Sequence, residues 1–215
     1  TCGYGVDDPD KEHHFKTATE DVTKAYAYKT ALALNADYSM VSVSGYGIIS
    51  GFTNDGNKIP QQTIPQYYDK LGFSYNKFAD RITVSETEWD FERYKPDIIV
   101  INLGTNDMNY ATTDERKAEF EDGYLDFLKK VRSLNPDSYI FQTYGVMGTS
   151  LEENIENVRR KYMSETGDER IAFIPLTMQD EAADGIVADW HPSPRTHSLV
   201  SQKVTAAIKE TLGYK

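Results

Sequence analysis

The chain has 215 residues, of which 39% are hydrophobic and 27% are charged, and this is enough for one globular domain with its own core. Its formal net charge of −11 argues against nucleic acid and against an anionic membrane surface as partners. No apolar run approaches the roughly 20 residues that a membrane-spanning helix requires, and a single cysteine, Cys2, excludes a disulfide within the chain.

The first third of the chain mixes loop and regular structure. Residues 1–18 are rich in turn formers and are expected to be loop. Apolar residues at helical spacing predict a helix over 19–34, and a strand is predicted over 38–43. Residues 50–80 form a long irregular connection rich in Gly, Pro, Asn and aromatic residues, and such connections usually serve a site.

The most informative stretch is 98–109, which reads IIVINLGTNDMN. Its almost unbroken apolar start indicates a strand buried on both faces of a parallel sheet. In open α/β sheets the site lies just beyond the carboxyl ends of the strands, and the amide of Asn106 has two N–H donors that suit an oxyanion. The alternative is that Asn106 and Asp107 only turn the chain.

Helices and strands alternate in the second half. The predicted elements are, in order, a helix at 114–133, a strand at 139–143, a helix at 151–166 that Gly167 ends, a strand at 171–176 and a helix at 195–212. Thr113 or Asp114 is expected to cap the first of these helices, and its apolar stripe is Phe120, Tyr124, Phe127, Leu128 and Val131. This alternation predicts an α/β fold with a mainly parallel sheet and helices on both faces. The pattern also calls for one more strand ahead of Thr1.

A second candidate site is the stretch 189–193, Asp-Trp-His-Pro-Ser, between the last strand and the last helix. His191 is a side chain able to act as a general base near neutral pH, and Asp189 can fix its tautomer as in a Ser-His-Asp triad. The alternative is a helix entry in which Asp, Ser and Pro are capping residues. His13 and His14 lack further ligands at metal-binding spacing, so no metal site is expected.

Taken together, a strand ending in Ser-Gly, a strand ending in Gly-Thr-Asn-Asp and a final Asp-x-His resemble the SGNH (GDSL-type) hydrolases. That resemblance implies a three-layer α/β/α, flavodoxin-like fold. It also implies an oxyanion hole that includes Gly45 and Asn106. Asp189 and His191 match the family's Asp-x-x-His block, but with one intervening residue instead of two.

A closer resemblance is to carbohydrate esterase family 2, whose members carry Asp-Trp-His-Pro-Ser at this point. The opening Thr-Cys-Gly-Tyr-Gly and the stretches 17–20 and 24–28 are also similar to that family, so the likeness covers nearly the whole chain. In this family the nucleophilic serine lies in a Gly-Asp-Ser-Ile stretch directly before the position of Thr1. The resemblance therefore implies that residues 1–215 form a catalytic domain whose first, central strand and serine lie upstream, with a β-sandwich domain further upstream.

The resemblance implies a serine esterase that removes O-acetyl groups from plant polysaccharides such as xylan or glucomannan. His191 would be the base, Asp189 would orient it, and Gly45 N–H with the Asn106 side chain would hold the oxyanion. Ser44 and Ser193 lack the strand-to-helix elbow of a nucleophile within the chain.

Three aromatic residues are candidate contacts for the sugar. They are Trp190, Tyr46 and Tyr144, and Trp190 can alternatively pack as a core residue under the last helix. Asp107 is expected to bond to the backbone rather than to substrate.

No metal or organic cofactor is implied. The expected partners are an acetylated polysaccharide or oligosaccharide and the N-terminal segment, in the same or another chain, and the implied substrate suggests a secreted protein. Two other functions stay open: another SGNH esterase or a lipase that acts on small acyl esters, and a carbohydrate-binding domain that has lost catalysis.

Overall fold

The computed structural model describes residues 2–73, 77–78 and 81–214. The chain divides into two compact units. The first comprises Thr1–Ser44, Thr143–Thr149 and Ile174–Lys215, and the second comprises Gly45–Gln142 and Ser150–Phe173.

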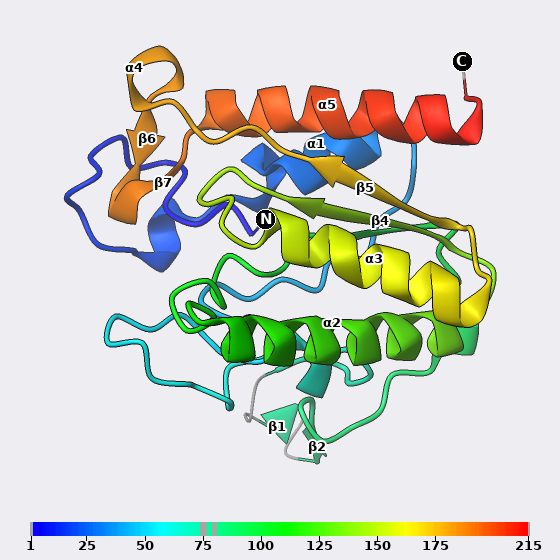
Figure 1. The fold of residues 1–215 in the computed structure, drawn as a ribbon. Helices are drawn as coiled ribbons and strands as arrows, with labels where there is room; N and C mark the ends of the chain where they lie inside the picture. The colour runs from blue at the N-terminus through cyan, green and yellow to red at the C-terminus, as the bar shows by residue number, and fades with distance from the viewer. Residues whose placement is uncertain (1, 74–76, 79–80, 215) are drawn as a thin grey trace. The chain divides into compact units, whose positions relative to one another are not determined.

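A parallel sheet with two helices dominates the second unit. Strands β3 (Ile98–Ile101), β4 (Tyr139–Tyr144) and β5 (Ile171–Pro175) lie in the order β3-β4-β5, and helices α2 (Asp114–Leu134) and α3 (Glu152–Thr166) connect them. Right-handed crossovers that step in one direction place their helices on the same face of a sheet. Accordingly α2 packs against α3 (Figure 1).

Helix α2 agrees with its sequence prediction. The hydroxyl oxygen of Thr113 caps it by accepting a hydrogen bond from the backbone N–H of Arg116. The predicted apolar stripe is buried, and its members are Phe120, Tyr124, Phe127, Leu128 and Val131. Helix α3 ends as predicted at Gly167, whose φ of 69° is the left-handed conformation that glycine adopts without strain.

In the first unit, helix α1 (Tyr26–Ala33) packs against helix α5 (Pro194–Leu212). Ser193 caps α5 by accepting from the backbone N–H of Thr196. His197 of α5 is buried, and its Nδ1 accepts a hydrogen bond from the backbone N–H of Tyr26. Burial lowers the pKa of His197 to about 3, so this histidine is a neutral core residue.

Three local predictions are wrong. Residues 38–43 belong to no strand of the described chain, and Tyr38 and Val41 are 48% and 52% exposed. The predicted helix at 19–34 is regular only over α1, with short 3-10 turns before it. Strand β3 is not buried on both faces, since Val100 is 37% exposed. The stretch 38–43 failed because an apolar run forms a strand only where another strand supplies hydrogen bonds. Val100 is exposed because β3 is an edge strand of the described sheet.

Smaller elements complete the fold. Strand β6 (Ile186–Val187) pairs antiparallel with β7 (His191–Pro192), directly after the four-residue helix α4 (Glu181–Asp184). Strands β1 (Lys77–Phe78) and β2 (Ile82–Thr83) form another antiparallel pair. Of the predicted acid–base residues, His191 lies in β7 and Asp189 lies in the turn between β6 and β7.

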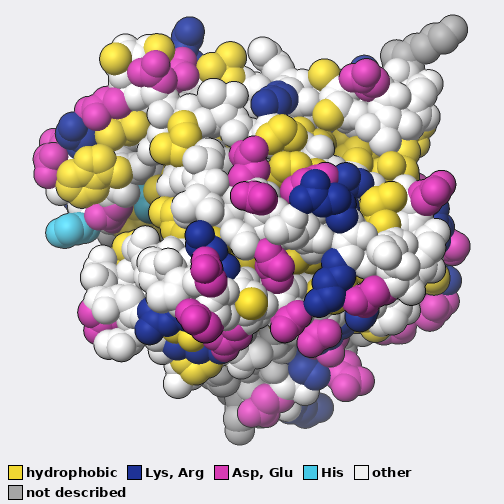
Figure 2. Space-filling view, viewed as in Figure 1, with side chains coloured by type: hydrophobic (Ala, Val, Ile, Leu, Met, Phe, Trp, Pro, Cys, Tyr) yellow, Lys and Arg dark blue, Asp and Glu magenta, His cyan; other side chains and the backbone are white. Residues whose placement is uncertain are grey.

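The surface agrees with the acidic composition. Figure 2 shows acidic side chains spread over the visible face and interspersed with basic ones rather than gathered in one patch. Among the described residues, every helix is too short or too polar to span a bilayer.

Candidate active site

His191 lies in a tight hairpin formed by residues 186–192, here called the His191 hairpin, in which Val187 pairs with His191. At its tip, Asp189 and Trp190 have φ values of 51° and 58°. Left-handed conformations in non-glycine residues cost on the order of 1–3 kcal/mol each and persist only where the surroundings enforce them. Such strain is typical of functional sites.

The imidazole of His191 has a defined tautomer. Its Nδ1 lies 2.9 Å from the main-chain oxygen of Asp189 and 3.3 Å from that of Ala188. Because carbonyl oxygens only accept, Nδ1 must carry the proton and Nε2 is left with a lone pair. Burial lowers the pKa of His191 below its ordinary value. The ring is therefore neutral at pH 7 and can accept a proton at Nε2.

The carboxylate of Asp189 has other partners. Its Oδ2 accepts from the Tyr4 hydroxyl and the Phe15 backbone N–H, both at 2.8 Å, and its Oδ1 lies 2.9 Å from His14 Nδ1. Burial tends to raise the pKa of this carboxyl, but the hydrogen bonds from these three groups outweigh burial and hold the pKa below its ordinary value. Asp189 thus contacts His191 through its main-chain oxygen, whereas its carboxylate anchors residues 4–15.

Tyr4, His14 and Phe15 were not identified as site residues from the sequence. Tyr4 lies in the Thr-Cys-Gly-Tyr-Gly stretch that carried the family resemblance, which was its only signal. His14 was considered only as a metal ligand. Within the described residues, no group of three His, Cys, Asp or Glu side chains is arranged to hold a metal ion.

In the second unit, residues 45–50 are here called the Gly45 loop. They contact Asn106 and Asp107, which follow β3 in the chain. Asn106 Nδ2 donates to the main-chain oxygen of Tyr46 at 2.8 Å. That bond uses one of the two amide hydrogens, so one N–H is left for another acceptor. Gly45 has a φ of +80°, a conformation that favours glycine.

Asp107 fixes the Gly45 loop. Its fully buried carboxylate accepts hydrogen bonds of 2.8 to 3.0 Å from the backbone N–H groups of Ile48, Ile49 and Ser50. A Cβ on Gly47 would lie 2.4 Å from Asp107 Oδ2, so only glycine allows this approach. The prediction that Asp107 bonds to the backbone is confirmed.

The three predicted aromatic contacts differ in exposure. Trp190 is 47% exposed, which is incompatible with the alternative of a core tryptophan. The ring of Tyr46 lies near Tyr67 and the exposed Phe73. Tyr144, by contrast, is fully buried at the end of β4. The predicted sugar contact of Tyr144 is therefore a misassignment, because a buried ring presents no face to a ligand.

The hydroxyl of Ser193 is used to cap helix α5. Its hydroxyl donates to the main-chain oxygen of Asp184 at 2.7 Å and accepts from Thr196 N–H. The capping interpretation of the Asp-Trp-His-Pro-Ser stretch therefore holds for Ser193, while Asp189 and His191 lie in the hairpin before it.

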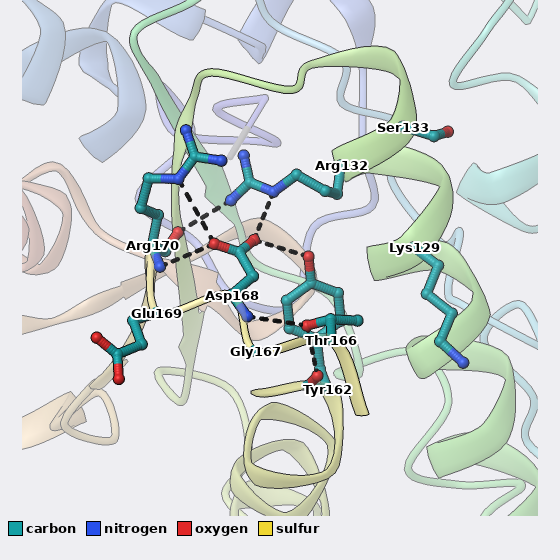
Figure 3. Close-up of a pocket in the computed structure, with 9 residues that line it drawn as sticks. All are labelled: Lys129, Arg132, Ser133, Tyr162, Thr166, Gly167, Asp168, Glu169 and Arg170. Carbon is teal, nitrogen blue, oxygen red and sulfur yellow. Dashed lines mark hydrogen bonds and ion pairs between the residues drawn. The ribbon is translucent and has the colours of Figure 1, made fainter. Parts of the chain in front are cut away.

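An open pocket elsewhere in the second unit contains none of the predicted site residues. Figure 3 shows Asp168 at its centre, bonded to Arg132, Arg170 and Tyr162. Arg132 also donates to the main-chain oxygens of Asn135 and Ser138. One carboxylate is shared by two guanidinium groups, and the remaining donors of Arg132 go to main-chain oxygens, so the network joins the ends of α2 and α3.

Comparison with known proteins defines the class. Residues 1–199 match the GDSL-like lipase/acylhydrolase family, and the chain belongs to this family of ester hydrolases. The cellulase/esterase CelE of Acetivibrio thermocellus is 33% identical over 223 residues, covering 100% of this chain and 25% of CelE. An acetylxylan esterase/glucomannan deacetylase of Cellvibrio japonicus is 25% identical, covering 100% of this chain and 55% of that protein.

A solved structure agrees with this assignment. A family two carbohydrate esterase from Clostridium thermocellum, in complex with cellohexaose, matches with a TM-score of 0.83 and 32% identity over 100% of this chain and 62% of that one. The predicted fold class, a three-layer α/β/α fold of the SGNH type, and the resemblance to carbohydrate esterase family 2 are thereby confirmed. The chain spans less than two thirds of the length of each of these proteins.

Proposed function

We propose that this chain is part of a secreted serine esterase that removes O-acetyl groups from plant polysaccharides such as xylan or glucomannan. The observation that supports this most directly is the tautomer of His191. Its Nδ1 is held by main-chain oxygens, so its Nε2 is suited to take a proton from a nucleophile. The relatives named acetylxylan esterase/glucomannan deacetylase motivate the substrate class.

The nucleophile in this proposal is a serine in the sequence N-terminal to Thr1, as the family pattern implies. His191 Nε2 accepts the serine proton while the serine oxygen forms a bond to the acetyl carbon. The tetrahedral intermediate then breaks its bond to the sugar oxygen, which leaves with the proton from His191. A water molecule then gives a proton to His191 as its oxygen bonds to the acetyl carbon. The bond to the serine oxygen breaks, the serine oxygen takes the proton back from His191, and acetic acid is released.

Asp189 assists in two ways. Its main-chain oxygen orients the imidazole, and its negative charge favours the imidazolium that forms during each proton transfer. In a Ser-His-Asp triad the carboxylate bonds directly to the imidazole. Here the carboxylate makes no direct bond to the imidazole, because its oxygens are hydrogen-bonded to Tyr4, His14 and Phe15. It acts on His191 only through its charge.

The oxyanion that develops on the acetyl oxygen needs hydrogen-bond donors. We assign this role to the backbone N–H of Gly45 and to the Asn106 amide, together with the N–H of the nucleophile. The support is local: the Asn106 amide is fixed by Tyr46 and retains a second hydrogen. Preorganised donors of this kind are typical of acyl transfer.

For the sugar, the exposed ring of Trp190 and the ring of Tyr46 are the proposed contacts. Flat aromatic faces suit the apolar faces of pyranose rings. No metal or organic cofactor takes part in this scheme.

The test uses the intact protein that contains this chain. Hydrolysis rates are compared for 4-nitrophenyl acetate and 4-nitrophenyl octanoate, and acetate release is measured from acetylated xylan. We expect the acetate ester to be preferred and acetate to be released from xylan. A preference for octanoate contradicts deacetylation and favours a lipase-like enzyme. Cello-oligosaccharide binding without any ester hydrolysis favours a carbohydrate-binding domain instead.

A further inference from the structure

Three aromatic rings stack beside the His191 hairpin. The ring centroids of Tyr4 and His191 are 3.9 Å apart with an interplanar angle of 25°, and those of Tyr4 and Phe15 are 4.4 Å apart with an angle of 26°. Two rings at such distances cannot share one face of a third ring. Tyr4 therefore lies between Phe15 and the imidazole of His191.

Hydrogen bonds tether the same stack at its polar edge. The hydroxyl of Tyr4 and the backbone N–H of Phe15 both donate to Asp189 Oδ2 at 2.8 Å. Burial, and then the Asp189 carboxylate, raises the pKa of the Tyr4 phenol. Tyr4 therefore remains a donor across the pH range of activity assays, and its ring is fixed at both the face and the hydroxyl.

The backbone around Tyr4 is also held against the hairpin. Ala188 N–H donates to Asp8 O and Asp189 N–H donates to His13 O, both at 3.0 Å. A Cβ on Gly5 would lie 2.8 Å from the Ala188 side chain. Tyr4 is thus a rigid part of the surroundings of His191.

The hydrogen bond at Nδ1 cannot alone fix the imidazole of His191. It restrains the distances from Nδ1 to its acceptors, whereas the orientation of the ring depends on two torsion angles, χ1 and χ2. A flat partner against the face removes that freedom. We propose that Tyr4 is a positioning residue whose ring face holds the plane of the His191 imidazole, so that Nε2 points at the nucleophile.

The chemistry of the ring face suits this role. His191 becomes positively charged as it takes the nucleophile's proton, and the face of an aromatic ring attracts cations. The same contact that sets the angle of the imidazole therefore favours the charged form during the reaction. This inference rests on the proposed esterase function, since it assigns His191 as the base.

Two substitutions of Tyr4 separate the ring from its hydroxyl. Tyr4→Leu removes the face, and we expect kcat for 4-nitrophenyl acetate to fall about 10- to 100-fold with KM nearly unchanged, because small errors in orientation cost rates of this size. Tyr4→Phe keeps the face and loses only the bond to Asp189, so it should retain kcat within about fivefold. Tyr28→Leu is the matched control, because Tyr28 is a half-buried tyrosine of the same unit whose ring makes an edge-to-face contact with Tyr38, away from His191.

The geometry can be tested independently of activity. In proton NMR spectra of the intact protein, a ring stacked on His191 shifts the imidazole resonances upfield. The upfield shift should be present in the wild type and persist in Tyr4→Phe. It should vanish in Tyr4→Leu; if Tyr4→Leu does not fold, the test rests on the wild type and Tyr4→Phe.

Several results would overturn the proposal. They are an absent upfield shift, equal losses of kcat in Tyr4→Phe and Tyr4→Leu, a change in KM alone, or an equal loss in Tyr28→Leu. A wild type that shows the upfield shift but no ester hydrolysis overturns the proposed function instead, and the two failures are thereby distinguished.

Discussion

The His191 hairpin and the Gly45 loop are both irregular segments, but they are held by different means. The hairpin contains two strained residues, and an ionised, partly exposed carboxylate ties it to residues 4–15 through Tyr4, His14 and Phe15. The Gly45 loop is held by a fully buried carboxylate, that of Asp107, through three successive backbone N–H groups.

The difference matches the proposed chemistry of each segment. A general base must change its charge during turnover, so it benefits from a site where charge can be balanced and partly solvated. An oxyanion donor must stay fixed in position during the reaction, so a buried and rigid support suits it. The comparison predicts that substitutions at the hairpin change rate and pH dependence, whereas substitution of Asp107, which supports the Gly45 loop, changes stability.

The largest expected effect is that of His191→Ala. Removing the base should lower kcat for 4-nitrophenyl acetate by about 10²- to 10⁴-fold. His13→Ala is the matched control: His13 pairs with Asp8 and leaves the Asp189 carboxylate untouched. It should keep kcat within a factor of about two. If the two variants lose activity equally, the hairpin does not contain the base.

The next effect is that of Asn106→Ala in the second unit. Loss of one oxyanion donor should lower kcat by about 10²- to 10³-fold. Asn109→Ala is a close control because Asn109 Nδ2 also donates to a main-chain oxygen, that of Thr53, at 2.9 Å. Steady-state kinetics of both variants, with thermal unfolding as a check on folding, decides the matter. An Asn106→Ala enzyme no slower than Asn109→Ala would leave Asn106 as a turn residue, the alternative that the sequence left open.

Local sequence signals predicted the regular elements better than the contacts of the site. The Thr113 cap, the apolar stripe of α2 and the stop at Gly167 each depend on residues within a few positions of one another, so spacing alone reveals them. The strand predicted at 38–43 failed because strand formation depends on a partner strand, which local sequence does not specify.

The same limit explains what was missed at the hairpin. The Asp-Trp-His-Pro-Ser stretch identified Asp189 and His191 as candidates because they are two residues apart. The residues that bond the Asp189 carboxylate lie 174 to 185 positions earlier in the chain. A tyrosine such as Tyr4 carries no local mark of such a contact, so its place beside His191 becomes visible only in three dimensions.

A third prediction concerns the Asp189 side chain. In a serine protease triad, altering the aspartate lowers kcat about 10⁴-fold. Here the main-chain oxygen holds His191 Nδ1, so Asp189→Ala should cost only about 10-fold in kcat. Asp189→Asn, which keeps an acceptor, should cost less. Rates of 4-nitrophenyl acetate hydrolysis in the two variants test this. A 10⁴-fold loss in a folded Asp189→Ala protein would show that the carboxylate acts directly on the imidazole.

The smallest expected effect on rate, and the one that separates the two segments most directly, is at Asp107. Burial raises the pKa of this carboxyl to about 6, and the hydrogen bonds from Ile48, Ile49 and Ser50 lower it only in part. The folded protein therefore binds a proton more tightly at this group than the unfolded chain, whose ordinary aspartate pKa is about 3.9. The contribution of Asp107 to the free energy of unfolding should then be greatest below about pH 4 and fall as the pH rises to about 6.

Chemical denaturation of the wild type and of Asp107→Asn between pH 4 and 7 isolates this titration, because asparagine does not ionise. As the pH rises across that range, the wild type should lose up to about 3 kcal/mol of unfolding free energy relative to Asp107→Asn. Asp189→Asn serves as the opposite case: its carboxyl pKa is lowered, so the advantage of the wild type over Asp189→Asn should be lost as the pH falls below about 4. A difference for Asp107→Asn that instead grows in favour of the wild type with rising pH would mean that the three N–H donors outweigh burial. The Gly45 loop would then be held by an ionised carboxylate at every working pH.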